Sequence, residues 1–193
     1  MVRGPGWDTA SPDARRALDR LVAGLPADVA AVDLPCEFDR ALEIVHGLLN
    51  AHLADRFGAL PEETLRSFCP PLQEGIVAGR ALSAARYLEL ETMADRLTAL
   101  AAALFDDHDA LITLSAPGEA TRLEEGPGSG AMSMPWSLCG LPTVSLPLLR
   151  GTNGMPIGVQ LVGCQGGDRN LLRVAAWLTD TVTLNDKFTH EQA

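Results

Sequence analysis

Lysine is nearly absent from this sequence, in which Lys187 is the only example among 193 residues. It lies in a polar stretch close to the C-terminus, where we expect no rigid core around it. A lysine acts as a general base when burial lowers its pKa toward neutral values. These residues therefore contain no candidate for catalysis by a buried lysine base.

Positive charge and long apolar runs are also scarce. Fifteen Lys and Arg stand against 25 Asp and Glu, which gives a net charge of −10 at pH 7. Nucleic acids and anionic membranes select for clustered cations, so we expect neither as a partner. No apolar run approaches the roughly 18 residues that a membrane-spanning helix needs. Residues 1–7 lack the apolar core of a signal peptide, so the sequence predicts a cytoplasmic protein.

The cysteine patterns of zinc sites and disulfide frameworks are missing as well. No CxxC pair occurs, and the four cysteines are far apart: Cys36, Cys69, Cys139 and Cys164. We interpret them as small apolar side chains in a reducing compartment. His46 and His52 are six residues apart in a helical segment, so they point to different faces. No metal or cofactor is predicted.

The remaining composition is that of one globular domain. Hydrophobic residues make up 47% of the chain and charged residues 21%, which is typical of soluble proteins. A chain of 193 residues is long enough for one sizeable core. It contains no internal repeat, low-complexity tract or long linker, so residues 1–193 are predicted to form a single domain.

Helical periodicity covers much of the first 105 residues. Ser11-Pro12 is typical of a helix start, because the hydroxyl caps free N–H groups and proline suits the first turn. Further helices are predicted over 38–57, from 61, over 72–79 after Cys69-Pro70-Pro71, and over 83–105. The two longest have apolar stripes predicted at Leu42, Val45, Leu49 and Leu53, and at Leu88, Met93, Leu97, Leu100 and Leu104.

Short β-rich runs alternate with these helices, at residues 28–35, 110–115, 143–149 and 156–162. Asn153-Gly154, between the last two runs, is a strong hairpin signal. A glycine-rich turn then leads to Asp168, which can cap a closing helix. The apolar side of that helix is predicted at Leu171, Leu172, Ala175, Ala176 and Leu178. The alternation predicts an α/β fold, a mixed β-sheet flanked by helices.

Three stretches suggest chemistry, and each has a more ordinary interpretation. Ser129 lacks the spacing and the strand–helix setting of a nucleophile elbow, so a flexible loop is favoured. The turn at 163–168 lacks the phosphate-loop patterns, and Asp168 would repel a phosphate. The acidic cluster lacks calcium-loop spacing and is favoured as a solvated helix end; its members are Asp106, Asp107, His108 and Asp109.

The most specific stretch of the chain runs from Gly126 to Asp180. It contains Met134-Pro-Trp-Ser-Leu-Cys-Gly-Leu-Pro-Thr-Val-Ser-Leu-Pro147, Gly154-Met-Pro-Ile-Gly-Val-Gln-Leu-Val-Gly163 and Asp168-Arg-Asn-Leu-Leu-Arg-Val-Ala175. These linked motifs resemble the C-terminal part of amidase-signature hydrolases. The resemblance covers nearly the whole chain, but only the latter part of a family member.

The resemblance implies that the intact enzyme hydrolyses amides with a Ser–cis-Ser–Lys triad from the family's N-terminal half. The present sequence contains no Gly-Gly-Ser-Ser-like core, so no catalytic residue is carried over. What matches is the substrate-side wall of the pocket, at Met132, Met134, Trp136, Gly140 and Pro142. Judged without the family, Trp136 is either a pocket wall or a core aromatic residue.

Three hypotheses follow. In the first, the chain is the C-terminal portion of an amidase that acts on a small-molecule amide and is inactive without a complementing N-terminal half. In the second, it is a non-catalytic binding or structural protein derived from an amidase. Its unpaired strand edge then makes it a homo-oligomer or recruits a partner chain. The third, an independent enzyme with a site at residues 106–109, has no supporting nucleophile or metal geometry.

Overall fold

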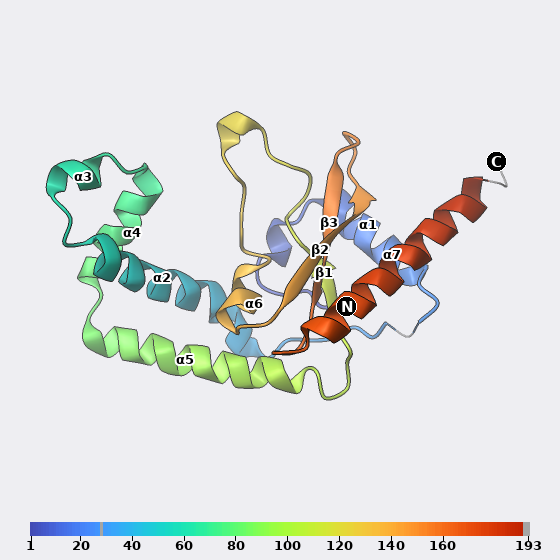
Figure 1. Cartoon of the computed structure of the whole chain (residues 1–193), viewed down its shortest axis with the longest axis horizontal. Helices are drawn as coiled ribbons and strands as arrows, with labels where there is room; N and C mark the ends of the chain where they lie inside the picture. The colour runs from blue at the N-terminus through green and yellow to red at the C-terminus, as the bar shows by residue number, and fades with distance from the viewer. Residues whose placement is uncertain (28, 191–193) are drawn as a thin grey trace.

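The computed structural model describes residues 1–27 and 29–190, with side chains described as far as residue 183. Figure 1 shows α1 and α7 beside a small sheet and the helices α2 to α5 extending to its other side. The helices are α1 (Pro12–Ala23), α2 (Ala41–Phe57), α3 (Glu62–Arg66), α4 (Pro70–Ala81), α5 (Ala84–Ala103), α6 (Met134–Leu138) and α7 (Asp168–His190). The strands are β1 (Leu111–Leu114), β2 (Thr143–Arg150) and β3 (Pro156–Val162). Short 3₁₀ turns are η1 (Trp7–Thr9), η2 (Cys36–Arg40) and η3 (Leu123–Glu125).

The predicted combination of helices and a sheet is confirmed. The three strands lie in the order β1-β3-β2 and pair antiparallel. The predicted β2–β3 hairpin turns through Asn153-Gly154, and Gly154 has a φ of +79°, a conformation that glycine adopts without strain. Parallel pairing among the described residues is confined to a bridge between Val2 and Val32.

The predicted strand at 28–35 is wrong for the part that the structure describes, residues 29–35; Asp28 lies outside it. This segment makes the single bridge to Val2 and forms no ladder. A strand needs a partner along its length. The N-terminal segment turns away directly afterwards, where Trp7 N donates to Gly4 O at 3.0 Å.

One face of the sheet carries the first core, which is covered by α1 and α7. Ser11 caps α1 as predicted, with its Oγ accepting from Ala14 N at 3.3 Å. On α7 the buried residues are Leu171, Ala175 and Leu178. The predicted stripe was too wide, because Leu172 and Ala176 are exposed. A helix that lies on a sheet buries a narrow row of side chains spaced three and four apart.

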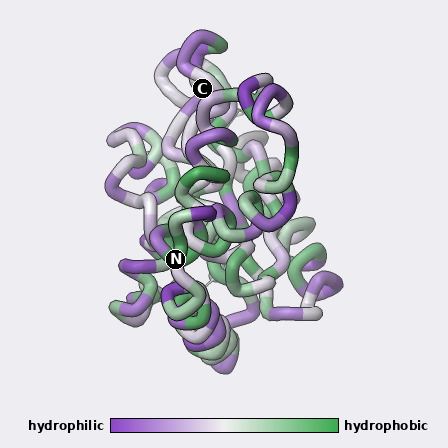
Figure 2. The backbone as a smooth tube through the Cα atoms, turned by 90° about the vertical axis from the view of Figure 1, so that its left-hand side faces the viewer, coloured by the Kyte–Doolittle hydropathy of each residue, from purple (hydrophilic) through white to green (hydrophobic). Residues whose placement is uncertain are grey.

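The second core joins α2, α5 and α6 to the end of the sheet that contains Leu111 and Val162. Here both predicted stripes need correction. On α2 the buried residues are Ala41 and Ile44, and Leu49 is 45% exposed. On α5, Leu97 is buried as predicted, but Leu88 is 61% exposed. In Figure 2, with this end toward the viewer, polar and apolar residues alternate around the helices without one clear stripe. Such helices are oriented by their packing partners more than by their own pattern.

Helix α4 lies closely against α2. It begins at Pro70 and not at Leu72, because proline lacks only an N–H that the first helical turn leaves unpaired. Gly75 and Gly79 are both buried on its inner side. A Cβ atom added at Gly79 would lie 1.9 Å from the backbone oxygen of Asn50, so the glycine permits the close approach.

Candidate functional site

The segment with the predicted wall residues is a short helix with a complete C-terminal cap. Helix α6 has proline in its first turn and Cys139 as its C-cap, and the next residue is Gly140, whose φ of +63° lies in the left-handed region. Gly140 N donates to Ser137 O at 3.1 Å, and Leu141 N donates to Trp136 O at 3.0 Å. These two bonds define a Schellman motif, which explains the glycine and fixes where β2 starts.

The five predicted wall residues divide between the interior and the surface. Met132 is buried in the sheet core, and Trp136 is buried in the helical core. Met134 and Pro142 are half-buried, and Gly140 is exposed. Solvent therefore reaches the backbone of the α6 cap and the half-buried side chains, and the two buried residues anchor the segment. The assignment of the five as a substrate wall stays a prediction.

Trp136 packs as a core aromatic residue in this chain. It is 1% exposed, and its ring centroid lies 6.0 Å from that of Phe38. Among the residues that the structure describes, no acceptor lies within hydrogen-bond distance of its Nε1. Burying an unpaired N–H is costly, so the ring contributes through its contact area.

The sheet face opposite the first core carries polar side chains, two of them buried, that sequence reasoning missed. We call it the polar sheet face; it consists of Thr113, Ser115, Ser145 and Gln160. Ser115 Oγ and Ser145 Oγ share a hydrogen bond of 2.7 Å above Gly158. Gln160 is 3% exposed, and its Nε2 donates to Met132 O at 3.3 Å. Gln160 therefore joins this face to the segment of the predicted wall.

A signal for this face was present in the sequence. Side chains alternate along a strand, so Ser145 and Gln160 lie opposite the apolar residues that flank them in Thr143–Arg150 and Pro156–Val162. An isolated glutamine in an apolar strand is expected to satisfy its amide with a specific partner.

In the polar sheet face, Ser115 and Ser145 reach solvent, but neither is an activated nucleophile. In the described part of the chain, neither Ser115 nor Ser145 bonds to a carboxylate, an imidazole or an amine. A serine without an adjacent base is a weak nucleophile. The backbone at Lys187 belongs to α7, and its side chain lies outside the described residues.

The cysteines have different environments. All four are free thiols, and they differ in burial, because Cys36 and Cys69 are exposed. Their neighbours Pro35 and Pro70 place them at helix starts on the surface. Cys139, beside Gly140, is buried, and this burial raises the pKa of its thiol to about 11. At neutral pH it is a protonated core residue.

The other candidate residues have local structural contacts. Ser129 Oγ accepts from Ala131 N at 3.2 Å within a loop. His108 Nδ1 lies 2.9 Å from Leu104 O, which places the imidazole at the end of α5. Over residues 1–27 and 29–183, no three His, Cys, Asp or Glu side chains gather in an arrangement that could hold a metal ion. Within the described residues, no helix has the length and apolarity to cross a bilayer.

Comparison with known proteins gives consistent matches. A family model described as Amidase matches residues 1–172. The 1-carboxybiuret hydrolase subunit AtzE of Pseudomonas sp. strain ADP is 31% identical over 195 residues, covering 91% of this chain and 41% of that protein. The 2-amino-5-chloromuconic acid deaminase of Comamonas testosteroni is 27% identical over 188 residues, covering 88% of this chain and 40% of that protein.

Solved structures show the same arrangement. The crystal structure of an amidase superimposes with a TM-score of 0.76 at 26% identity, covering 89% of this chain and 42% of that one. A structure described as a vestigial protein complex of an s-triazine catabolic enzyme gives a TM-score of 0.71 at 29% identity, covering 93% of this chain and 42% of that one. The chain spans about two fifths of the length of these relatives.

Proposed function

The chain belongs to the amidase family, and on that premise we propose that residues 130–163 form one wall of the substrate site of an amide hydrolase. The observation that carries this proposal is the buried hydrogen bond from Gln160 to Met132 O. It holds the α6 segment beside the polar sheet face. Met134, Gly140 and Pro142 then border a surface on which hydroxyl groups can orient a polar substrate such as an amide.

In the proposed reaction, a serine attacks the amide carbonyl, the amine leaves, and water releases the acid from the acyl-enzyme. The family's Ser–cis-Ser–Lys triad is not among these 193 residues. This chain would therefore supply substrate contacts, and a complementing N-terminal half would supply the nucleophile and its base. The chain alone is expected to be inactive toward amides.

The strand edge of β2 supports a need for such a partner. Gly163 N donates to Pro142 O at 2.9 Å, and hydrogen-bonded pairs alternate along an antiparallel ladder. The register therefore leaves the backbone groups of Thr143 and Ser145 pointing away from β3. An edge of this kind accepts another strand. We propose that the edge binds the N-terminal half of an amidase, in the cytoplasm, where free thiols persist.

Reconstitution tests the function directly. This chain is co-expressed with the part of the Pseudomonas AtzE subunit that it does not match, and ammonia release from simple primary amides is measured. We expect activity from the pair and none from either half. The control pair carries alanine in place of the nucleophilic serine of the N-terminal half. Activity from this chain alone would refute the division of roles.

A non-catalytic, self-associating protein is the alternative, and the same open β2 edge favours it. Light scattering over a dilution series separates the two ideas. A concentration-dependent homo-oligomer that excludes the N-terminal half supports the alternative. A stable monomer at every concentration removes it.

A further inference from the structure

The tip of the β2–β3 hairpin is held by a carboxylate from a distant part of the chain. Glu119 Oε1 accepts from Asn153 N at 3.1 Å and from Met155 N at 2.9 Å, and its Oε2 accepts from Asn153 Nδ2 at 2.7 Å. The backbone N–H groups of Asn153 and Met155 are thus paired with an anion instead of water.

The hairpin turn leaves space for the Glu119 carboxylate beside Gly151. A Cβ atom added at Gly151 would lie 2.3 Å from Glu119 Cδ, so only glycine leaves room for the carboxylate at that position. The N–H groups of Asn153 and Met155 converge on this one anion, as backbone N–H groups do in anion-binding turns. The contact is specific to this pair of segments, which lie more than 30 residues apart in sequence.

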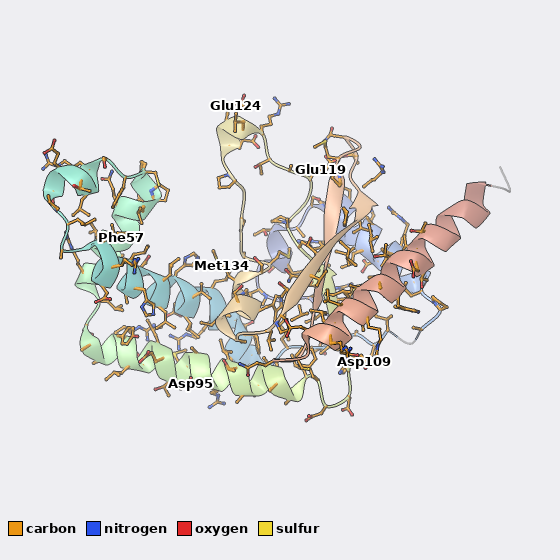
Figure 3. All side chains as sticks on the ribbon, in the orientation of Figure 1. Phe57, Asp95, Asp109, Glu119, Glu124 and Met134 are labelled. Carbon is orange, nitrogen blue, oxygen red and sulfur yellow. The ribbon has the colours of Figure 1, made fainter. Side chains whose placement is uncertain are left out.

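Glu119 also marks the base of a projecting loop. Just before it, Ser11 N donates to Pro117 O at 2.7 Å, which fastens the chain to the start of α1. After it, residues 120–130, which we call the arm, leave the body of the molecule. Figure 3 shows Glu124 at the far end of the arm, Glu119 near the hairpin and Met134 where the chain returns.

The arm is folded within itself but exposed at its tip. Thr121 Oγ1 donates to Gly126 O at 2.5 Å, and Arg122 N donates to Glu125 Oε2 at 3.2 Å. Leu123 is 95% exposed. The arm therefore keeps a local shape, and its direction depends on how its two ends are held. One end is held by Glu119, and the other leads to the wall segment at Met132.

We infer that Glu119 is a positioning residue, which sets the arm and, through it, the wall segment against the substrate. The inference rests on the proposed function for its consequence in catalysis, but not for the contact itself. If the contact is lost, the arm and wall sample more orientations before substrate binds. Substrate binding is then weakened, and the chemical step on the bound substrate is affected much less.

Hydrogen–deuterium exchange on the chain tests the contact without any activity. Glu119→Ala is expected to speed exchange at Asn153 and Met155 about tenfold or more and to speed exchange across the arm. Glu119→Gln keeps one acceptor oxygen for the two backbone donors but sets its amide against Asn153 Nδ2, so we expect an intermediate effect. Glu124→Ala, a matched change at the arm tip, should leave these amides unchanged. Equal exchange in Glu119→Ala and the parent chain would overturn the inference.

A reversal of partners gives a second test if Glu119→Ala fails to fold. Asn153→Asp alone places two carboxylates face to face and should speed exchange. In the chain with both Glu119→Gln and Asn153→Asp, the new amide can donate to the new carboxylate. We expect recovery of slow exchange to within about threefold of the parent. A double variant no better than the single variants would show that the two side chains do not act on each other.

The reconstituted enzyme supplies the kinetic test. Glu119→Gln should raise KM about tenfold and change kcat less than twofold, with Glu124→Ala unchanged in both. A fall in kcat at constant KM would contradict a positioning role. If the parent pair shows no activity, the proposed function fails, and the exchange experiments still decide whether Glu119 orders the arm.

Discussion

Replacing Gly79 by alanine is expected to destabilise the chain although alanine is the better helix former. The added Cβ would lie 1.9 Å from Asn50 O and 2.8 Å from Ala54 Cβ. The first of these is a backbone atom of α2 and cannot rotate away. An ordinary contact needs at least about 3.4 Å, so α4 must move outward by roughly 1.5 Å.

The magnitude follows from two opposed effects. Helix propensity alone favours alanine over glycine by about 1 kcal/mol. Overpacking costs typically about 1–3 kcal/mol, and a clash with a backbone atom belongs at the upper end. The free energy of unfolding should therefore fall by about 2 kcal/mol. The reverse change at the exposed neighbour, Ala78→Gly, involves propensity alone and should cost about 1 kcal/mol.

Thermal unfolding followed by circular dichroism distinguishes packing from propensity. For a domain of this size, 1 kcal/mol corresponds to a shift in Tm of roughly 2–4 °C. We expect Gly79→Ala to lower the Tm by about 4–8 °C and Ala78→Gly by about 2–4 °C. A higher Tm in Gly79→Ala would mean that α4 does not pack closely on α2, and the reasoning from the helix crossing would be refuted.

Three further predictions follow from burial. Ellman's reagent at pH 8 should react promptly with Cys36 and Cys69 and reach Cys139 only after unfolding. Because burial raises the pKa of Cys139 from 9.0 to about 11, the folded state holds this proton more tightly than the unfolded state. The free energy of unfolding should therefore decline from pH 9 toward 11 in the parent but not in Cys139→Ala. Trp136→Ala should cost about 3–5 kcal/mol in urea unfolding, and Trp136→Phe much less, because the unpaired N–H is removed with little loss of ring contact. Gly158→Ala should cost about 1–3 kcal/mol and separate the two serines above it, since its Cβ would lie 2.7 Å from each Oγ; an unchanged unfolding midpoint would contradict this packing.

Signals that act between near neighbours in sequence predicted the structure well. The Ser11 cap, the Asn153-Gly154 turn and the helix start at Asp168 are all found where the sequence placed them. Each depends on a few consecutive residues whose side chains or backbone angles determine the outcome locally. The family resemblance also rested on such a continuous stretch.

Features set by tertiary packing were not predictable in the same way. Leu88 fits the helical period of α5 and is nevertheless exposed, because α5 turns a different row of side chains toward α2. Gly79 carries no sequence signal for the closeness of α4 to α2. Glu119 contacts Asn153, which lies 34 residues later in the sequence, and no local sequence pattern predicts such a pairing. The polar sheet face could have been predicted from the alternation of side chains along the strands. The buried hydrogen bond from Gln160 to Met132 O could be found only in the structure.

The surface that the proposed partner would cover is polar, and this determines how association should behave. The edge strand exposes Thr143 and Ser145, and Pro147 supplies no N–H for an added ladder. The apolar face of the sheet is already covered by α1 and α7. The chain therefore has a core of its own, and little apolar area is left to bury against a partner. The free energy gained on binding an N-terminal half then comes from hydrogen bonds and should be modest. Amidase activity in a mixture of separately purified halves should then rise with concentration through the micromolar range. Full activity at nanomolar concentration would show that an apolar interface, absent from this account, holds the halves together.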